Sequence, residues 1–163
     1  MRIYLIGLPG VGKTTIGKFL NELTAFSVFD VDKLIEQDEK KEILEIFNVN
    51  GESYFRDLES NKLKELLKVD KAIICCGGGI VERLENKDFM DGLIIYLKGN
   101  LDLIKSRVNM ASRPLLKTIS LEDLYERRGA KYEYFANVSI NLSDTSRLTA
   151  QEIYMYLRKN SLL

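Results

Sequence analysis

One segment near the start of the chain has the pattern of a phosphate-binding loop. Residues 7–14 are Gly-Leu-Pro-Gly-Val-Gly-Lys-Thr and match G-x-x-x-x-G-K-[ST] at every fixed position, between an apolar run and a helical pattern. The glycines let backbone N–H groups turn toward a phosphate, and the following helix directs its positive N-terminus at the same anion. We expect Lys13 to contact the β- and γ-phosphates and the Thr14 hydroxyl to bind Mg²⁺. The motif predicts that the chain binds a nucleoside triphosphate.

Two carboxylates, Asp30 and Asp32, end the second predicted strand. Residues two apart in a strand project to the same side, so both would face one site at the carboxyl edge of the sheet. There, one carboxylate would hold a water of the Mg²⁺ shell and the other would contact an acceptor hydroxyl. N-capping of the next helix by either residue is an equal alternative, and one Asp is able to do both.

A helix predicted after Gly51 carries Arg56 and Glu59, three residues apart. At about 100° per residue, both charged residues fall in the same sector as four apolar residues of this helix, Phe55, Leu63, Leu66 and Leu67. Charged residues on an apolar stripe are paired or have a function. A buried structural ion pair and an arginine that binds a substrate anion, oriented by the glutamate, both fit the pattern, and the two can coexist.

Three glycines, Gly77, Gly78 and Gly79, follow the third predicted strand. At the carboxyl end of a strand, glycines let a ligand approach the backbone closely and offer it bare N–H groups. An ordinary tight turn is the alternative.

A proline-containing segment, residues 110–116, interrupts a helical pattern that begins near Leu101. Phosphoryl transfer requires positive charge over developing negative charge and the exclusion of water. We therefore interpret the segment as a mobile lid that carries Arg113, with a surface loop as the alternative. Taken alone, Arg127 and Arg128 are typical of a solvated charge pair, and residues 144–147 are typical of a capped helix start.

The composition excludes several kinds of chemistry. The chain of 163 residues has no histidine, which excludes Ser-His and Cys-His nucleophiles and histidine-bound zinc. Its two cysteines, Cys75 and Cys76, are adjacent, so we expect neither a disulfide nor a metal cage, but reduced thiols in a cytosol. Basic and acidic residues balance at 24 each, and no apolar run has the length of a membrane span. We expect a cytoplasmic protein that binds neither nucleic acid nor membrane.

Short runs rich in Ile and Val alternate with longer helical patterns. Strands are predicted over residues 2–6, 26–29, 71–75, 93–97 and 138–142. Helices are predicted over 13–24, 51–69, 100–109, 119–135 and 147–160, with a weaker one over 33–47. Strands separated by helices predict an α/β fold with a five-stranded parallel sheet covered by helices on both faces.

Together these segments resemble the shikimate kinases, small P-loop kinases of the nucleoside-monophosphate-kinase-like fold. The resemblance covers essentially the whole chain. It rests on G-L-P-G-V-G-K-T-T, D-V-D at 30–32, F-x-x-x-G-E-x-x-F-R-x-x-E at 47–59, the triple glycine and R-P-L-L at 113–116. It implies a three-layer P-loop kinase fold in one domain, residues 1–163, with a substrate-binding region at about 31–60 and a lid at about 108–119. The implied reaction is ATP- and Mg²⁺-dependent phosphorylation of the 3-hydroxyl of shikimate, on the way to chorismate and aromatic amino acids, by a monomer.

The resemblance also implies roles for individual residues. The implied catalytic residues are Lys13, Asp32 and Arg113. The implied ATP-binding residues are Gly10, Val11, Gly12, Lys13, Thr14, Thr15, Arg113 and Arg147. The implied shikimate-binding residues are Asp32, Arg56, Glu59, Gly77, Gly78, Gly79 and Arg128, and the implied Mg²⁺ residues are Thr14 and Asp30. Phe47 and Phe55 are implied as apolar walls, and Arg107 as a stacking partner of adenine.

The chain departs from the family pattern in three places. Cys76 precedes the triple glycine, where Ser or Thr is usual, and the segment between Arg107 and Arg113 is short. Ala130 stands where a proline usually follows the substrate arginine, so Arg127 is the alternative to Arg128. Two other functions remain open: another small-molecule or nucleotide kinase of this fold, such as a gluconate kinase, and a non-catalytic nucleotide switch or assembly ATPase. The set of Arg56, Glu59 and Arg128 favours a small carboxylate as the acceptor.

Overall fold

A parallel β-sheet organises the computed structural model, which describes residues 1–107 and 119–163. In the described part of the chain the sheet has five strands in the order β2-β3-β1-β4-β5, and all neighbouring pairs are parallel. The strands are β1 (Arg2–Ile6), β2 (Ser27–Asp30), β3 (Ala72–Cys75), β4 (Leu93–Lys98) and β5 (Val138–Asn141). The predicted strands are confirmed, although β2 begins and ends one residue later than predicted.

The central strands are buried on both faces, which explains their continuous apolar sequences. Every residue of β3 is buried, and so are residues 3–6 of β1. The register pairs Leu5 with Cys75 and Ile6 with Tyr96. The carboxyl ends of β1, β3 and β4 therefore meet at one edge of the sheet.

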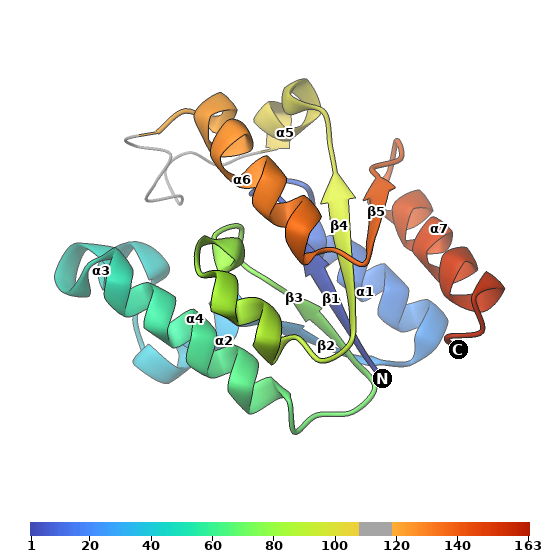
Figure 1. Ribbon diagram of the computed structural model, residues 1–163, viewed down its shortest axis with the longest axis horizontal. Helices are drawn as coiled ribbons and strands as arrows, with labels where there is room; N and C mark the ends of the chain where they lie inside the picture. The colour runs from blue at the N-terminus through green and yellow to red at the C-terminus, as the bar shows by residue number, and fades with distance from the viewer. Residues whose placement is uncertain (108–118) are drawn as a thin grey trace.

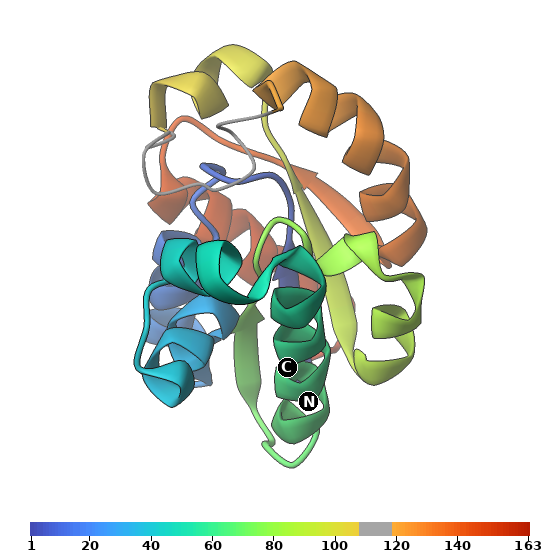
Figure 2. The same cartoon turned by 90° about the vertical axis from the view of Figure 1, so that its left-hand side faces the viewer.

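Helices cover both faces of the sheet, as predicted (Figure 1). Helices α1 (Lys13–Thr24) and α7 (Ser146–Lys159) pack together on one face. The other face carries α4 (Glu52–Leu66), α6 (Leu121–Phe135) and two short 3₁₀ helices, η1 (Ile80–Glu82) and η2 (Leu84–Phe89). Figure 2 shows α5 (Leu101–Arg107) at the end of the sheet opposite the two chain termini.

The region predicted as one weak helix over 33–47 contains two helices, α2 (Val31–Glu39) and α3 (Ile43–Asn50). Lys40 ends α2 with a left-handed φ of 53°, which an uninterrupted helix does not allow. Oε1 of Glu36 then accepts a hydrogen bond from the backbone N–H of Ile43 at the start of α3. Both helices pack against α4, so the chain doubles back beside the carboxyl edge of the sheet.

Side-chain caps fix where three helices begin. Asp30, Ser120 and Thr145 accept hydrogen bonds from backbone N–H groups in the first turns of α2, α6 and α7. The sequence did not predict η1 and η2, since each is short and has no helical repeat. The predicted lid at about 108–119, with Arg113, lies outside the described residues except for residue 119.

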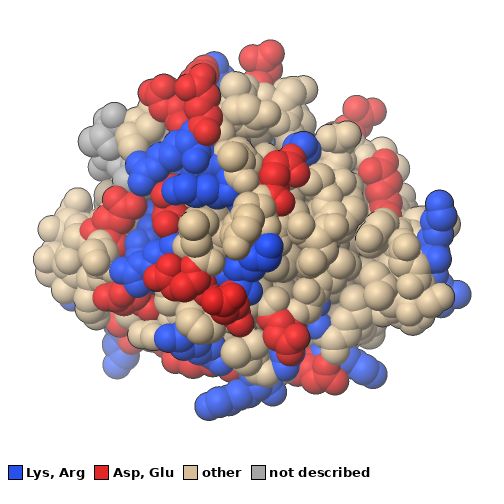
Figure 3. All heavy atoms as spheres, in the orientation of Figure 1, with Lys and Arg blue, Asp and Glu red and all other residues tan. Residues whose placement is uncertain are grey.

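Acidic and basic side chains intermingle left of centre and along the rim of the face seen in Figure 3, in agreement with the balanced composition. None of the helices in the described ranges is long and apolar enough to span a membrane.

Candidate active site

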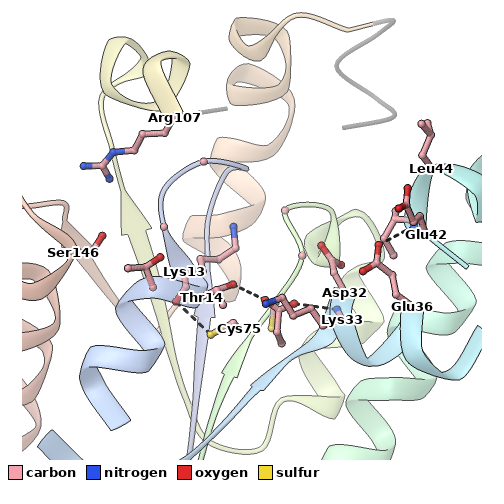
Figure 4. Close-up of a pocket in the computed structure, with 18 residues that line it drawn as sticks. Lys13, Thr14, Asp32, Lys33, Glu36, Glu42, Leu44, Cys75, Arg107 and Ser146 are labelled. Carbon is pink, nitrogen blue, oxygen red and sulfur yellow. Dashed lines mark hydrogen bonds between the residues drawn. The ribbon is translucent and has the colours of Figure 1, made fainter. Parts of the chain in front are cut away.

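A cavity of about 860 Å³ opens at the carboxyl edge of the sheet (Figure 4). Its walls come from the loop before α1, the start of α2, the segment before and at the start of α3, the turn after β3, and the ends of α5 and α7 that face the loop. The lining residues are Gly10, Gly12, Lys13, Thr14, Thr15, Asp30, Asp32, Lys33, Glu36, Glu42, Ile43, Leu44, Cys75, Cys76, Gly77, Gly78, Arg107 and Ser146. Many residues predicted from separate motifs thus share one cavity.

The glycines of residues 7–14, the P-loop, are required by the backbone. Gly10 and Gly12 have φ values of 85° and 89°, in the left-handed region. A Cβ on Gly7 would lie 2.8 Å from the carbonyl oxygen of Leu97, so the loop packs directly on the end of β4. Gly12 is the N-cap of α1, which directs the N-terminus of that helix into the loop.

Lys13 bends back over the P-loop. Its Nζ donates hydrogen bonds to the carbonyl oxygens of Gly7, at 2.7 Å, and Leu8, at 2.9 Å. The side chain lines the cavity, so its ammonium lies beside the backbone N–H groups that bind phosphate in loops of this kind.

Thr14 and Asp30 form the oxygen-rich part of the cavity. The Thr14 hydroxyl donates a hydrogen bond to Oδ2 of Asp30, while Oδ1 of Asp30 accepts one from the backbone N–H of Lys33, at 3.2 Å. Asp30 therefore combines the two roles that the sequence left open, capping α2 and facing the P-loop. A hydroxyl and a carboxylate are hard oxygen donors, and Mg²⁺ typically takes only one or two protein ligands beside substrate phosphates. These residues fit a magnesium ion.

The strand argument for Asp32 was wrong. β2 ends at Asp30, and Asp32 lies in the first turn of α2, so alternation along a strand does not align the two carboxylates. Helix geometry brings Asp32 to the turn after β3 instead. A Cβ on Gly77 would lie 2.6 Å from Oδ1 of Asp32 and 2.9 Å from Oε1 of Glu59. Two carboxylates from α2 and α4 therefore meet at this glycine.

Arg56 and Glu59 form a buried ion pair on α4. Nη1 of Arg56 donates to Oε2 of Glu59 at 2.6 Å, and Nη2 contacts Oε1 of Glu52 at 3.2 Å. The guanidinium also lies 5.9 Å and 5.4 Å from the ring centres of Phe47 and Phe55. The structural pair is confirmed, and the two aromatic rings contact the arginine.

Several charged residues around Glu59 affect its pKa. Burial raises the pKa of Glu59 to about 7, and Asp32 adds to the shift. The charges of Arg56 and Arg128 act in the opposite direction. Arg56, Asp32 and Arg128 therefore all lie within electrostatic reach of one buried carboxyl group.

The turn at residues 77–79 is packed too tightly for side chains. A Cβ on Gly78 would lie 2.9 Å from Cδ of Pro9 in the P-loop, and a Cβ on Gly79 would lie 2.2 Å from Nη1 of Arg56. The turn is thus tight, as one interpretation of the sequence predicts, and it contacts the P-loop and Arg56. The approach of a ligand to its backbone stays a prediction.

Arg128 and Arg127 differ in burial although they are adjacent on α6. The side chain of Arg128 is 3% exposed and that of Arg127 is 47% exposed. Both pair with Glu82, which also binds Lys131. The sequence argument missed Glu82, because nothing local in the segment after the triple glycine identifies the partner of a distant helix.

The other predicted residues are spread around the cavity and beyond it. Val11 is a buried residue of the P-loop, and Thr15 lines the cavity. A Cβ on Gly12 would lie 3.3 Å from Oγ of Ser146 and 3.9 Å from Nη1 of Arg107, so α5 and α7 converge on the loop. Arg147 lies outside the lining set, 4.4 Å from the ring centre of Phe19, and its place at the nucleotide stays a prediction.

The two cysteines are buried at the end of β3 and just after it. Sγ of Cys75 contacts the carbonyl oxygen of Lys13 at 3.4 Å, and a Cβ on Gly17 would lie 2.7 Å from the same sulfur. Burial raises the pKa of Cys75 to about 12 and that of Cys76 well above its usual value. Both residues are free thiols, as the sequence predicts, and their burial favours the protonated form.

Comparison with known proteins identifies the family. The shikimate kinase family model matches residues 9–158. A shikimate kinase of Rippkaea orientalis is 39% identical over 160 residues, covering 94% of this chain and 86% of the relative. The structure of a shikimate kinase from Acinetobacter baumannii in complex with shikimate superposes with a TM-score of 0.92 at 32% identity, covering 99% of this chain and 95% of the other. A shikimate kinase from Aquifex aeolicus gives 0.87 at 32% identity, covering 99% of each chain. This chain therefore belongs to the shikimate kinase family, and it is a P-loop kinase.

Proposed function

We propose that the donor and acceptor of this kinase, ATP and shikimate, meet in the cavity at the carboxyl edge of the sheet. The reaction transfers the γ-phosphoryl group of ATP to the 3-hydroxyl of shikimate and yields shikimate 3-phosphate. One observation carries the assignment of the site: Lys13 and Thr14 of the P-loop line the same cavity as Asp32, Gly77 and Gly78. A phosphoryl donor and a small acceptor bound to these two groups of residues would share one cavity.

The nucleotide half of the proposal rests on the P-loop. Backbone N–H groups of residues 10–15 would bind the phosphates, together with the N-terminus of α1. Lys13 would leave the carbonyl oxygens of Gly7 and Leu8 and contact the β- and γ-phosphates. Arg107 at the end of α5, whose Nη1 lies close to Gly12, would contact the nucleotide from the α5 side of the cavity. Arg113 and Arg147 are proposed on the resemblance alone.

Mg²⁺ would be held by Thr14 directly and by Asp30 through a water molecule. The hydrogen bond between these two side chains, both of which line the cavity, supports this assignment. When bound, the ion neutralises charge on the β- and γ-phosphates.

The acceptor half consists of two carboxylates, Asp32 and Glu59, two arginines and the glycine turn. Arg56 would bind the shikimate carboxylate as a planar fork, held in place by Glu59. Arg128 would supply a second cation from α6, and the backbone at 77–79 would approach the ring of the acceptor closely. These positive charges favour an anionic acceptor over a neutral sugar.

Asp32 would orient the attacking hydroxyl and accept its proton. It lines the cavity and lies beside Gly77, on the acceptor side. Phosphoryl transfer proceeds through a loose transition state, so positioning of the hydroxyl contributes more than its deprotonation. We propose this reaction for a single domain, residues 1–163, that acts as a monomer in the cytoplasm on two small molecules.

A coupled assay of ADP release against a panel of acceptors tests the function. We expect turnover with shikimate and none above background with gluconate or nucleoside monophosphates, and quinate tests how strictly the ring is recognised. Equal turnover with gluconate would contradict the assignment of the acceptor. ADP release that is independent of every acceptor would instead favour a nucleotide switch.

A further inference from the structure

Glu82 is a buried carboxylate that the proposed reaction does not use. It is the last residue of η1, the 3₁₀ helix that begins directly after the glycine turn. The backbone N–H of Ile80 bonds to the carbonyl oxygen of Gly77 at 3.1 Å, and that of Glu82 bonds to Gly79 at 3.0 Å. Because η1 is fixed to the turn in this way, the position of the Glu82 carboxylate follows the position of the acceptor-side backbone.

Three cations of α6 surround this single carboxylate. Nε of Arg128 donates to Oε1 of Glu82 at 2.6 Å, while Arg127 and Lys131 bond to Oε2 at 3.1 Å and 3.0 Å. One negative charge leaves this group with an excess of positive charge. Only the pair of Arg128 and Glu82 is buried, with side chains 3% and 7% exposed.

The guanidinium of Arg128, which is not among the residues that line the cavity, carries a buried donor. Its Nη2 is buried and makes no hydrogen bond to any group in residues 1–107 or 119–163. Glu82 occupies Nε, so the orientation of the planar guanidinium is set from one side while Nη2 is left for another acceptor. A carboxylate ligand would satisfy this donor.

A second contact ties α6 to the glycine turn. The hydroxyl of Tyr132, one helical turn after Arg128, donates to the carbonyl oxygen of Gly78 at 2.5 Å. Its ring stacks on Tyr96 of β4, with ring centres 5.0 Å apart. Tyr132 fixes the distance between α6 and the turn, and Glu82 fixes the direction of Arg128 within that space.

We propose that Glu82 is a positioning residue for the acceptor: it orients Arg128 so that Nη2 meets the carboxylate of the bound shikimate. This inference rests on the proposed function, in which Arg128 binds the acceptor. Glu82 acts through Arg128 and does not touch the substrate. Removing its charge should therefore weaken acceptor binding and leave nucleotide binding unchanged.

Steady-state kinetics of Glu82→Gln test the proposal. We expect the KM for shikimate to rise at least about tenfold, the KM for ATP to stay within twofold, and kcat at saturating shikimate to fall by less than threefold. Glu133→Gln is the matched control, because Glu133 lies on α6 but pairs with Lys98 and Ser139. This control should match the wild type in all three constants.

Two further variants separate positioning from a general structural role. Glu82→Asp keeps the negative charge, which favours folding, but its side chain is shorter by one methylene group. Because the carboxylate then lies farther from Arg128, we expect the KM for shikimate to rise several-fold. In an Arg128→Lys background, Glu82→Gln should have no further effect, since the residue on which Glu82 acts is already changed. Additive losses in this double variant would overturn the proposal.

The outcomes distinguish the two levels of the argument. A wild-type protein that does not phosphorylate shikimate refutes the proposed function. A wild-type protein that does so, with unchanged KM for shikimate in Glu82→Gln and Glu82→Asp, refutes only the role of Glu82. Equal increases in the KM for ATP and for shikimate would likewise overturn it, because they indicate a global distortion. If Glu82→Gln does not fold and Glu82→Asp does, the KM for shikimate of Glu82→Asp tests the proposal: a several-fold rise supports it and an unchanged value refutes it.

Discussion

Gly79 lies directly against the guanidinium of Arg56: a Cβ at residue 79 would lie 2.2 Å from Nη1 and 2.4 Å from Cζ. The guanidinium has little freedom to retreat, because Glu59 and Glu52 bind it and Phe55 flanks it. The turn after β3 and the buried charge on α4 therefore determine each other's positions. This contact explains why a small residue is required at a position where the sequence left open a ligand-binding turn or an ordinary tight turn.

Gly79→Ala should displace Arg56 and damage both stability and acceptor binding. We expect a loss of about 1–3 kcal/mol in the free energy of unfolding, as for other overpacked sites, and a higher KM for shikimate than for the wild type. Gly129→Ala is the control, since a Cβ there meets nothing within 4 Å. It should be neutral or more stable by up to about 1 kcal/mol. Wild-type thermal unfolding and KM in Gly79→Ala would contradict the contact.

Lys13→Ala should abolish turnover and leave the fold intact. The ammonium supplies the charge for the β- and γ-phosphates, and no other lysine lies within residues 7–14. Lys18→Ala, on the exposed side of the same helix, should retain wild-type activity. Removal of a group that stabilises transition-state charge usually lowers kcat by more than about tenfold. If Lys13→Ala keeps more than about a tenth of the wild-type rate, the proposed role of Lys13 is wrong.

Arg56→Lys should weaken acceptor binding by roughly 1.5–3 kcal/mol, the range for hydrogen bonds to charged groups. A lysine replaces the planar fork with a point charge and cannot bridge Glu59 and Glu52 in the same way. Titration of shikimate measures the effect, and Arg83→Lys, which alters an exposed pair with Asp57, serves as the control. An unchanged affinity would mean that the ion pair of Arg56 is purely structural.

Asp32→Asn separates catalysis from binding at the acceptor hydroxyl. An amide keeps the shape and still bonds to a hydroxyl, but it takes no proton. We expect kcat to fall at least about a hundredfold, within the usual range for a general base, with acceptor affinity within a few-fold of wild type. Asp38→Asn, on the same helix but paired with Lys62, is the control. Lost affinity with surviving kcat would make Asp32 a binding residue only.

The contribution of Glu82 to the free energy of unfolding should decrease at acidic pH. Burial opposes its ionisation, but the hydrogen bonds from Arg128 and Lys131 outweigh burial and lower the pKa of Glu82 to about 2. A lowered pKa means that the folded state binds the charged form more strongly, so the contribution is present above about pH 4.5 and is lost as the pH falls toward 2. Urea unfolding of wild type and Glu82→Gln at several pH values measures it. The difference between the two should shrink as the pH falls, and a constant difference would contradict the assignment.

The sequence alone determined the sheet, most helices and the phosphate-binding half of the site. The conformation of residues 7–14 depends mainly on local sequence. Glycines adopt the left-handed φ values that the loop requires, and α1 begins directly at its end. Buried parallel strands likewise produce continuous apolar runs that are visible in any sequence. Local patterns were sufficient where local contacts create the structure.

Tertiary structure decided the acceptor half. The approach of Asp32 to Gly77, the burial of Arg128 instead of Arg127, and the position of Glu82 each depend on elements more than forty residues apart. Asp32 was predicted on the correct side of the sheet for the wrong reason, since it belongs to a helix. Side-chain type and spacing describe one element at a time, whereas burial and charge pairing arise only when α4, α6 and the turn after β3 pack together. That packing buries Arg128, and not the adjacent Arg127, in its pair with the Glu82 carboxylate.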